Sequence, residues 1–197
     1  MGKITDLLKT RSSTRRFSSR PIPQAILEDI LEAGRLSPSG GNQQPWRFGI
    51  VTDPELIAKI AQIAHRQGWM AHAPLLVILC TVFVSDEEGG RDIQIQRFPE
   101  HATAITSMEQ DLYHALNQEE HQTKIAGTHM VLAALEHGIG SCWVSRFEVR
   151  ALTELLCLPP NTLPAEILVF GYPESQQKPA PKKSREEILF FNQAKSS

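Results

Sequence analysis

The chain has 197 residues, of which 41% are hydrophobic and 21% charged, and its formal net charge is −2 at pH 7. This length allows one domain with a substantial core, and the charge excludes the basic surface of a general nucleic-acid-binding protein. The longest apolar run, 74–84, is about half of the roughly 20 residues that a membrane helix needs, and the first residues lack the pattern of a signal peptide.

The first part of the chain predicts helices and strands in mixed order. Apolar residues at helical spacing, strict alternation and continuous apolar runs are the signals for amphipathic helices, half-buried strands and fully buried strands. Asp53-Pro54-Glu55 is a helix start, with a cap residue, a proline at the first helical position and an acid in the first turn. The elements predicted here are a short helix with Ile4, Leu7 and Leu8, a helix over 24–35, a strand over 46–51, a helix from Pro54 to about Gln67, and a strand over 75–84 buried on both faces.

The second part begins with a polar stretch, 85–101, which predicts loops. Long helical periodicity follows over 103–137, with a predicted break near 117–120 and a stop at Gly138. Its last part, 125–134, is apolar almost all round and predicts a central buried helix. Because the strands and helices do not alternate regularly, the fold class is predicted to be α+β. The remaining elements are a strand over 141–144, a helix over 148–156 ended by Pro159-Pro160, a strand over 166–170, and a polar tail with an apolar end at 188–191.

Two segments could bind a phosphate. Arg11, Ser13 and Arg15 alternate, so an extended backbone would place all three side chains on one side. Guanidinium groups bind oxyanions with paired hydrogen bonds, which suits a phosphate. Lys183 and Arg185 repeat this pattern near the other end. The alternatives are a solvated basic loop and an ordinary charged tail.

The loop 36–46 carries two Gly, two Pro, two Ser, an Asn and two Gln between a predicted helix and a predicted strand. Glycine lets the backbone approach a ligand closely, and amide side chains both donate and accept hydrogen bonds. A plain connection does not need such a composition, so we expect a binding loop here. The glycines of 138–140 are a weaker signal, typical of the end of a helix, and they are not a dinucleotide fingerprint.

Neither a metal site nor nucleophilic catalysis is indicated. His114 and His121 have no carboxylate-histidine set with ligand spacing, and His129 lies within the apolar helix, where a hydrogen-bonded core histidine is expected. Cys142 lies in an apolar setting, in which a thiol is inert. The three cysteines lack metal or disulfide spacing, which favours reduced thiols and a cytoplasmic protein.

Taken in chain order, five blocks resemble the nitroreductase family of FMN-dependent oxidoreductases. They are Arg11-x-Ser-x-Arg15-x-Phe17, Pro38-Ser-x-x-Asn42-x-Gln44-Pro-Trp46, Leu132-Ala-Ala followed by Gly138-Ile-Gly-Ser-Cys-Trp143, Gly171-Tyr-Pro173, and Lys183-x-Arg185. The resemblance implies an α+β fold with a central, mostly antiparallel sheet surrounded by helices. It also implies an intertwined homodimer with an FMN in each of two interface sites.

Carried over position by position, the resemblance implies a set of FMN-binding residues and no catalytic side chain, because solvent can supply protons. The phosphate, the ribityl chain and the adjacent ring edge fall to Arg11, Ser12, Ser13 and Arg15, and the phosphate clamp is completed by Lys183 and Arg185. The isoalloxazine ring is approached by Pro38, Ser39 and Gly40 of the other subunit, with Asn42 and Gln44 nearby, and its N5 side by the backbone of Val144, Ser145 and Arg146. The chain departs from the common family pattern at Ser12, His129 and Ser145-Arg146, which bears on substrate and redox tuning more than on flavin binding.

The resemblance therefore predicts an enzyme that passes hydride from NADH or NADPH through flavin N5 to an electron-poor small molecule such as a nitroaromatic or a quinone, in two half-reactions. We expect one domain over 1–197, a variable lid over 85–120, and a tail, 174–197, that reaches the flavin site and the partner subunit. Three alternatives stay open: a specialised member such as a dehydrogenase, a dehalogenase or a flavin-consuming enzyme; a non-catalytic module that stores or senses FMN; and a structural protein whose basic segments are solvated surface.

Overall fold

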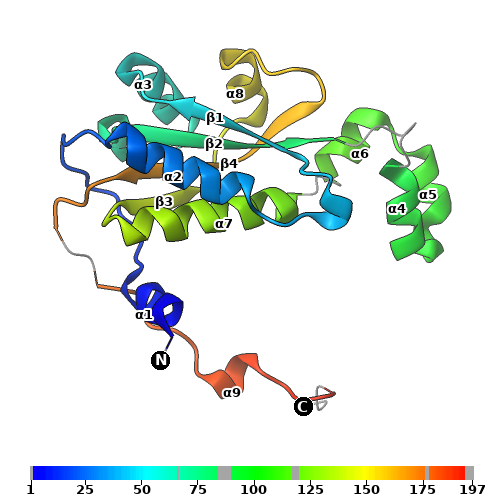
Figure 1. Cartoon of the computed structure of the whole chain (residues 1–197). Coiled ribbons are helices and arrows are strands. Elements are labelled where there is room, and N and C mark those ends of the chain that lie inside the picture. The colour runs from blue at the N-terminus through cyan, green and yellow to red at the C-terminus, as the bar shows by residue number, and fades with distance from the viewer. Residues whose placement is uncertain (1, 66, 84–89, 117–119, 176–177, 194–197) are drawn as a thin grey trace.

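A four-stranded antiparallel sheet forms the centre of the computed structural model, with the strand order β1-β2-β4-β3 (Figure 1). The structure describes all residues except 1, 66, 84–89, 117–119, 176–177 and 194–197. The predicted α+β class with an antiparallel sheet is confirmed. The strands are β1 (Trp46–Val51), β2 (Leu75–Val82), β3 (Gly140–Val144) and β4 (Thr162–Gly171).

Helices cover both faces of the sheet, so the fold has three layers (Figure 1). Helices α2 (Gln24–Arg35) and α7 (Glu120–Glu136) cover one face, and α3 (Pro54–Ile63) and α8 (Val149–Leu155) cover the other. Each face has its own apolar core. The other helical elements are α1 (Lys3–Thr10), α4 (Gly90–Arg97), α5 (Ala102–Ser107), α6 (Gln110–Leu116), α9 (Arg185–Ile188), and the short 3₁₀ turns η1 (Gly40–Asn42), η2 (Gly68–His72) and η4 (Pro99–His101).

Strand β2 is buried on both faces, as its apolar run predicts. Every residue from Leu75 to Thr81 is almost inaccessible to solvent, because β2 lies between β1 and β4 and helices pack on both sides. Side chains alternate between the two cores, with Leu76 and Ile78 on the α3 and α8 side and Val77 and Leu79 on the α2 and α7 side. The predicted residues beyond Phe83 lie outside the described part of this region.

Strand β4 begins at Thr162, four residues before the predicted start. Pro164 argues against a strand in the sequence, because proline cannot donate to a ladder. The structure accommodates it with a bulge: Leu79 pairs with Glu166 and Cys80 with Pro164, which leaves Ala165 without a partner. A bulge is one of the few sites at which a sheet tolerates proline.

Helix α3 ends at Ile63, short of the predicted end near Gln67. The carbonyl of Ile63 accepts the backbone amide of Glu148 at 3.3 Å, and the chain then turns into η2. A tertiary hydrogen bond has therefore replaced the next intrahelical one. Its start is as predicted, with the Asp53 carboxylate accepting the amide of Leu56 at 2.7 Å.

The prediction of loops over 85–101 is wrong for its described part, which contains α4 and η4. The Arg91 side chain holds this region together. Its Nη1 donates to the carbonyls of Ile105 at 2.6 Å and Met108 at 2.7 Å, and its guanidinium lies 4.5 Å from the centre of the Tyr113 ring. These contacts tie α4 to α5 and α6, and they are long-range relations that local periodicity does not reveal.

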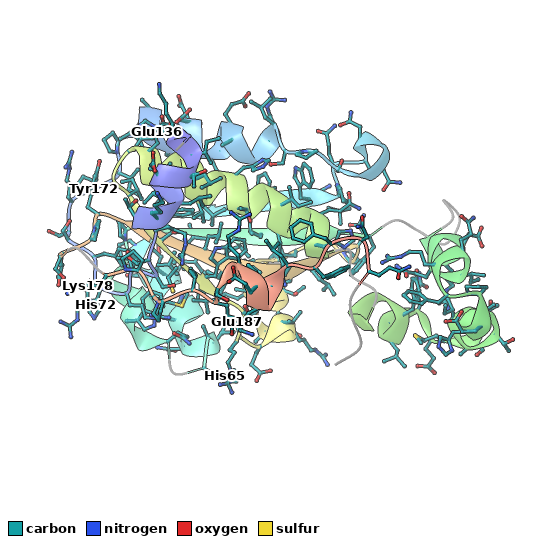
Figure 2. The ribbon with its side chains drawn as sticks, turned by 90° about the horizontal axis from the view of Figure 1, so that it is seen from below. His65, His72, Glu136, Tyr172, Lys178 and Glu187 are labelled. Atoms are coloured by element: carbon teal, nitrogen blue, oxygen red, sulfur yellow. The ribbon has the colours of Figure 1, made fainter. Side chains whose placement is uncertain are left out.

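The helical periodicity over 103–137 corresponds to three helices, α5, α6 and α7, with an additional break at Met108-Glu109. The predicted break at 117–120 falls mostly outside the described residues, although α7 begins at Glu120. Helices α4 to α6 stand beyond one end of the sheet in both views (Figures 1 and 2). Within the part of the chain that the structure describes, no helix is long and apolar enough to cross a membrane.

Candidate functional site

The segment that follows α1 runs beside the start of β3. The amide of Thr14 donates to the carbonyl of Ser141 at 2.9 Å, and Ser13 forms a parallel bridge with Ser141. Thr14 and Phe17 point inward, with 3% and 5% of their surface exposed. The segment is therefore an added strand-like edge, fixed by its buried residues.

The alternating residues Arg11, Ser13 and Arg15 all influence the buried thiol of Cys142 on β3, beside which this segment runs. Burial raises the pKa of this thiol, and the charge of Arg15, a hydrogen bond from Ser13 and the charge of Arg11 each oppose that rise. Two guanidinium groups and a hydroxyl are thus carried by one short segment beside β3. Guanidinium and hydroxyl groups suit an oxyanion, and their role in binding one stays a prediction.

Arg11 and Ser12 also line a cleft of about 240 Å³ between this segment and the end of α7. The cleft floor includes Gly138 and Gly140. Gly138, with φ of +71°, ends α7 as predicted, since a left-handed residue there is a common helix stop. Gly140 allows the segment to approach β3 closely, because a Cβ on it would collide with the side chain of Thr14.

We therefore expect Gly140→Ala to lower the free energy of unfolding by about 1–3 kcal/mol, the usual cost of overpacking. The added methyl must displace Thr14 and with it the segment of Arg11. Gly68→Ala is the matched control, since nothing lies within 4 Å of that position and its backbone is not left-handed. Chemical denaturation of both variants measures the difference, and equal stabilities would contradict the close approach.

The predicted binding loop is held in a strained conformation. Among its residues Gly41, Asn42 and Gln44 have φ of 54°, 56° and 51°. A left-handed glutamine is uncommon and costs about 1–3 kcal/mol, which the surrounding structure must supply. Two contacts do so: the Ser39 hydroxyl accepts the Gln44 amide at 2.9 Å, and the Gly40 amide donates to Gln122 Oε1 at 2.8 Å.

Pro38, Ser39 and Gly40 line a second cleft, of about 300 Å³, together with residues 121, 122 and 125 of α7. Asn42 and Gln44 are exposed. Gln122, which is buried and holds the loop, was not among the predicted site residues. A single amide within a helix gives no signal in the sequence.

The two clefts lie at opposite ends of α7. Gln122 contacts the loop near the start of the helix, and Leu135 lines the other cleft near its end. At 1.5 Å per residue these positions are about 20 Å apart along the axis. Figure 1 shows the same separation, with the 38–44 turn beyond one end of α7 and the 11–15 segment at the other.

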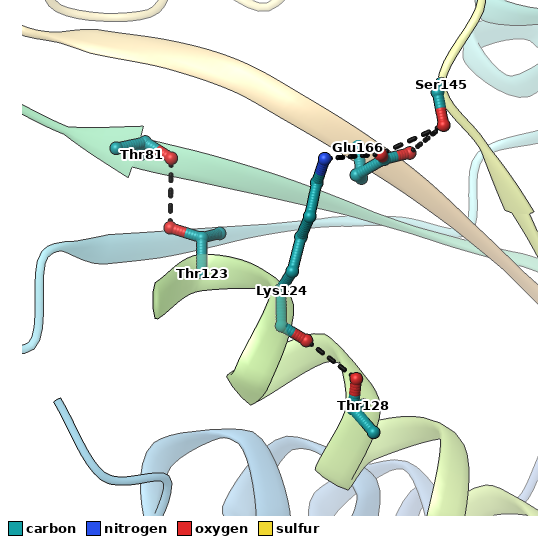
Figure 3. A network of polar contacts seen from close by, with 6 residues as sticks. All are labelled: Thr81, Thr123, Lys124, Thr128, Ser145 and Glu166. Carbon is teal, nitrogen blue, oxygen red and sulfur yellow. Dashed lines mark hydrogen bonds and ion pairs between the residues drawn. The ribbon is translucent and has the colours of Figure 1, made fainter. Parts of the chain in front are cut away.

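Ser145 and Arg146 directly follow β3 and are exposed. The Ser145 hydroxyl lies 2.7 Å and 2.9 Å from the two carboxylate oxygens of Glu166, and one of these oxygens lies 3.1 Å from Lys124 Nζ (Figure 3). The Thr81 and Thr123 hydroxyls are hydrogen-bonded beside this group at 2.9 Å. Sequence reasoning identified Ser145 but missed its two charged neighbours.

Lys183 and Arg185 are not brought to the other predicted residues within one chain. The described tail residues from 178 onward are all exposed, and the tail passes α1 and leaves the body of the fold (Figure 1). In the view from below, Glu187 marks α9 on the same tail (Figure 2). Ser184 caps α9 in a capping box with Glu187, so the tail has local order of its own.

His129 is half-buried and its Nδ1 lies 2.7 Å from the hydroxyl of Ser37, near the start of the binding loop. The predicted hydrogen bond is present, although the ring is half-buried and does not lie in the core. The contact is a second connection between α7 and the loop, besides that of Gln122.

The model of the nitroreductase family matches residues 8–172 of this sequence. The chain belongs to the nitroreductase family. Among curated relatives, an NADH dehydrogenase of Thermus thermophilus is 26% identical over 192 residues, which cover 92% of each chain. An FMN reductase [NAD(P)H] of Bacillus subtilis is 27% identical over 191 residues, covering 95% of this chain and 73% of the relative.

A solved structure supports the same family fold. The hypothetical oxidoreductase YcnD of Bacillus subtilis superposes with a TM-score of 0.81 at 23% identity, covering all of this chain and 76% of that one. The two chains therefore share the same fold. The family match stops at residue 172, before the tail with Lys183 and Arg185.

Proposed function

We propose that this chain is an FMN-dependent oxidoreductase that takes hydride from NADH or NADPH and passes electrons to an electron-poor small molecule, in two half-reactions. FMN would supply the hydride chemistry through N5, and the protein would supply binding and orientation. A nitroaromatic compound or a quinone is the acceptor class. The curated relatives named as an NADH dehydrogenase and an FMN reductase [NAD(P)H] support an oxidoreductase that uses a nicotinamide donor and FMN.

The observation that carries the proposal is the cleft that Arg11 and Ser12 line, on the segment that also carries Ser13 and Arg15. A phosphate monoester is close to dianionic and requires several cations. Each charge-assisted hydrogen bond contributes about 1.5–3 kcal/mol. The donors present therefore fit the phosphate end of FMN.

The strained loop fits the other end of the cofactor. Glycine at positions 40 and 41 leaves room for close approach, and Ser39, Asn42 and Gln44 offer hydroxyl and amide groups. Hydrogen bonds to Gln122 and within the loop hold these groups in place before any ligand arrives. Strain fixed in this way is typical of binding loops.

We further propose a homodimer in which each site takes the 38–44 loop from the partner. The clefts of one chain are about 20 Å apart along α7, so a two-fold pairing of α7 helices would bring the loop of each chain to the arginine segment of the other.

Apolar residues on this side of the single chain are uncovered, with Ile4 66% and Leu36 65% exposed. The tail adds Phe190 and Phe191, which are 67% and 82% exposed. Its Lys183 and Arg185 would then complete a phosphate clamp.

No side chain is nominated as a general acid or base, because solvent can protonate a reduced nitro group or quinone. Helices α4 to α6, within the 85–120 region, would form the lid that selects the acceptor. Arg91 would give that lid a fixed internal structure through its bonds to the carbonyls of Ile105 and Met108.

An absorbance spectrum of the purified protein, recorded anaerobically before and after NADH or NADPH, tests the proposal. We expect a yellow protein with flavin bands that bleach on addition of one or both donors. A colourless protein that also fails to bind added FMN would overturn it. A yellow protein that neither donor bleaches would instead favour the second candidate, a module that stores or senses FMN without turnover.

A further inference from the structure

Three consecutive residues at the start of α7 connect it to three different parts of the fold. Gln122 accepts the Gly40 amide of the binding loop, Thr123 pairs with Thr81 on β2, and Lys124 pairs with Glu166 on β4. All three contacts lie at the end of the sheet where β1 emerges from the loop. The start of α7 thus makes a group of polar contacts with a face of the sheet that is otherwise apolar.

The charged pair in this assembly is unusual for its position. Glu166 points to the α7 side of the sheet, two residues before Leu168, which belongs to the apolar core there. Its side chain is only 6% exposed, whereas that of Lys124 is 41% exposed. A buried carboxylate is costly unless it is paired and hydrogen-bonded. Here the ammonium and the Ser145 hydroxyl meet that need (Figure 3).

The Ser145 contact gives the pair a route to the cofactor. Val144 pairs with Ile167, so the end of β3 lies directly beside Glu166, and the chain then leaves the sheet at Ser145-Arg146. The family resemblance implies that this backbone, over Val144, Ser145 and Arg146, passes the N5 side of the flavin ring in the proposed function. A carboxylate bonded to Ser145 therefore both fixes that backbone and places charge close behind it.

We infer that Lys124 and Glu166 act as positioning residues that set the reduction potential of bound FMN, with Ser145 linking them to the segment beside the ring. This inference rests on the proposed function. The two charges have opposite effects. A buried negative charge near the ring disfavours added electrons, and a neighbouring ammonium favours them.

Single replacements should therefore shift the potential in opposite directions. Glu166→Gln keeps the side-chain shape and removes the negative charge, so the charge of Lys124 is no longer opposed by that of Glu166 and reduced FMN is favoured. Lys124→Gln leaves the carboxylate uncompensated and favours oxidised FMN. We expect each to change the ratio of affinities for reduced and oxidised FMN by at least threefold, which is about 14 mV for a two-electron couple.

The experiment is anaerobic redox titration of the FMN-loaded variants against a reference dye, with thermal unfolding to verify the fold. Lys124→Arg keeps the positive charge and should have the wild-type potential. The potential of the double variant, Lys124→Gln with Glu166→Gln, should lie between those of the two single variants. Glu154→Gln, on the other face of the sheet where Glu154 pairs with exposed Arg150, is the charge-matched control. A merely structural pair would lower stability without moving the potential in opposite directions.

Opposite shifts with rescue by arginine would support the inference. Shifts of the same sign, or none, in variants that fold and bind FMN would overturn it and leave the proposed function intact. Failure of the wild-type chain to bind FMN would overturn the proposed function itself, so the two failures are distinguishable.

Discussion

Replacing Arg11 with alanine should weaken FMN binding at least tenfold. Arg11 lies at the end of α1, lines the 240 Å³ cleft and belongs to the same segment beside β3 as Ser13 and Arg15. Loss of one charge-assisted contact costs about 1.5–3 kcal/mol, and about 1.4 kcal/mol corresponds to one decade of affinity. Fluorescence titration of the apoprotein with FMN measures the change.

Two variants sharpen this test. Arg11→Lys keeps the charge but loses the fork that binds two phosphate oxygens, so we expect an intermediate affinity. Arg150→Ala removes the same charge on α8, where the side chain is 92% exposed and pairs with Glu154; its affinity for FMN should equal that of the wild type. An unchanged affinity in Arg11→Ala would remove Arg11 from the site. Riboflavin, which lacks the phosphate, should bind wild type and Arg11→Ala alike.

Removal of residues 178–197 should cost still more, because the proposed tail serves two purposes. The described residues of this segment are exposed along their whole length and carry Lys183, Arg185 and the apolar run that ends in Phe191. We expect the shortened chain to lose dimer stability and at least 100-fold in FMN affinity, since two phosphate contacts of about one decade each are lost together. Light scattering and FMN titration measure the two effects separately.

Point replacements on the tail separate its two roles. Lys183→Ala should weaken FMN binding without changing the oligomeric state, and Lys182→Ala, a change of the same charge one residue away, should do neither. Replacing Phe190 and Phe191 with serine should destabilise the dimer. If the shortened chain binds FMN as tightly as the full chain, the tail takes no part in the site.

The elements that the sequence predicts most closely are those whose local signals agree. The helix over 24–35 and the strand over 46–51 have the predicted bounds, because periodicity and turn residues coincide there. The boundaries that differ depend on contacts between distant segments. The Glu148 amide donates to the Ile63 carbonyl, which would otherwise accept the next hydrogen bond of α3. A bulge opposite Leu79-Cys80 accommodates Pro164 within β4.

The candidate site divides in the same way. Residue type and spacing alone predicted that the alternating segment with Arg11 and the amide-rich loop with Asn42 bind a ligand. Guanidinium groups, glycines and amides are residue types typical of such segments. The side chains that hold these segments gave no such signal. Gln122 and Glu166 are single polar residues in a helix and a strand, and only packing gives them partners.

By itself, then, the sequence determined the secondary structure of most segments, the α+β class and which residues could bind an anion, since these follow from short-range periodicity and side-chain chemistry, whereas the antiparallel sheet was implied by the family resemblance. Only the tertiary structure decided where those residues lie. It placed the segment of Arg11, Ser13 and Arg15 beside β3, separated it from the 38–44 loop by most of the length of α7, and buried Glu166 beside Lys124. These relations depend on distances between residues far apart in the chain, which no local pattern encodes.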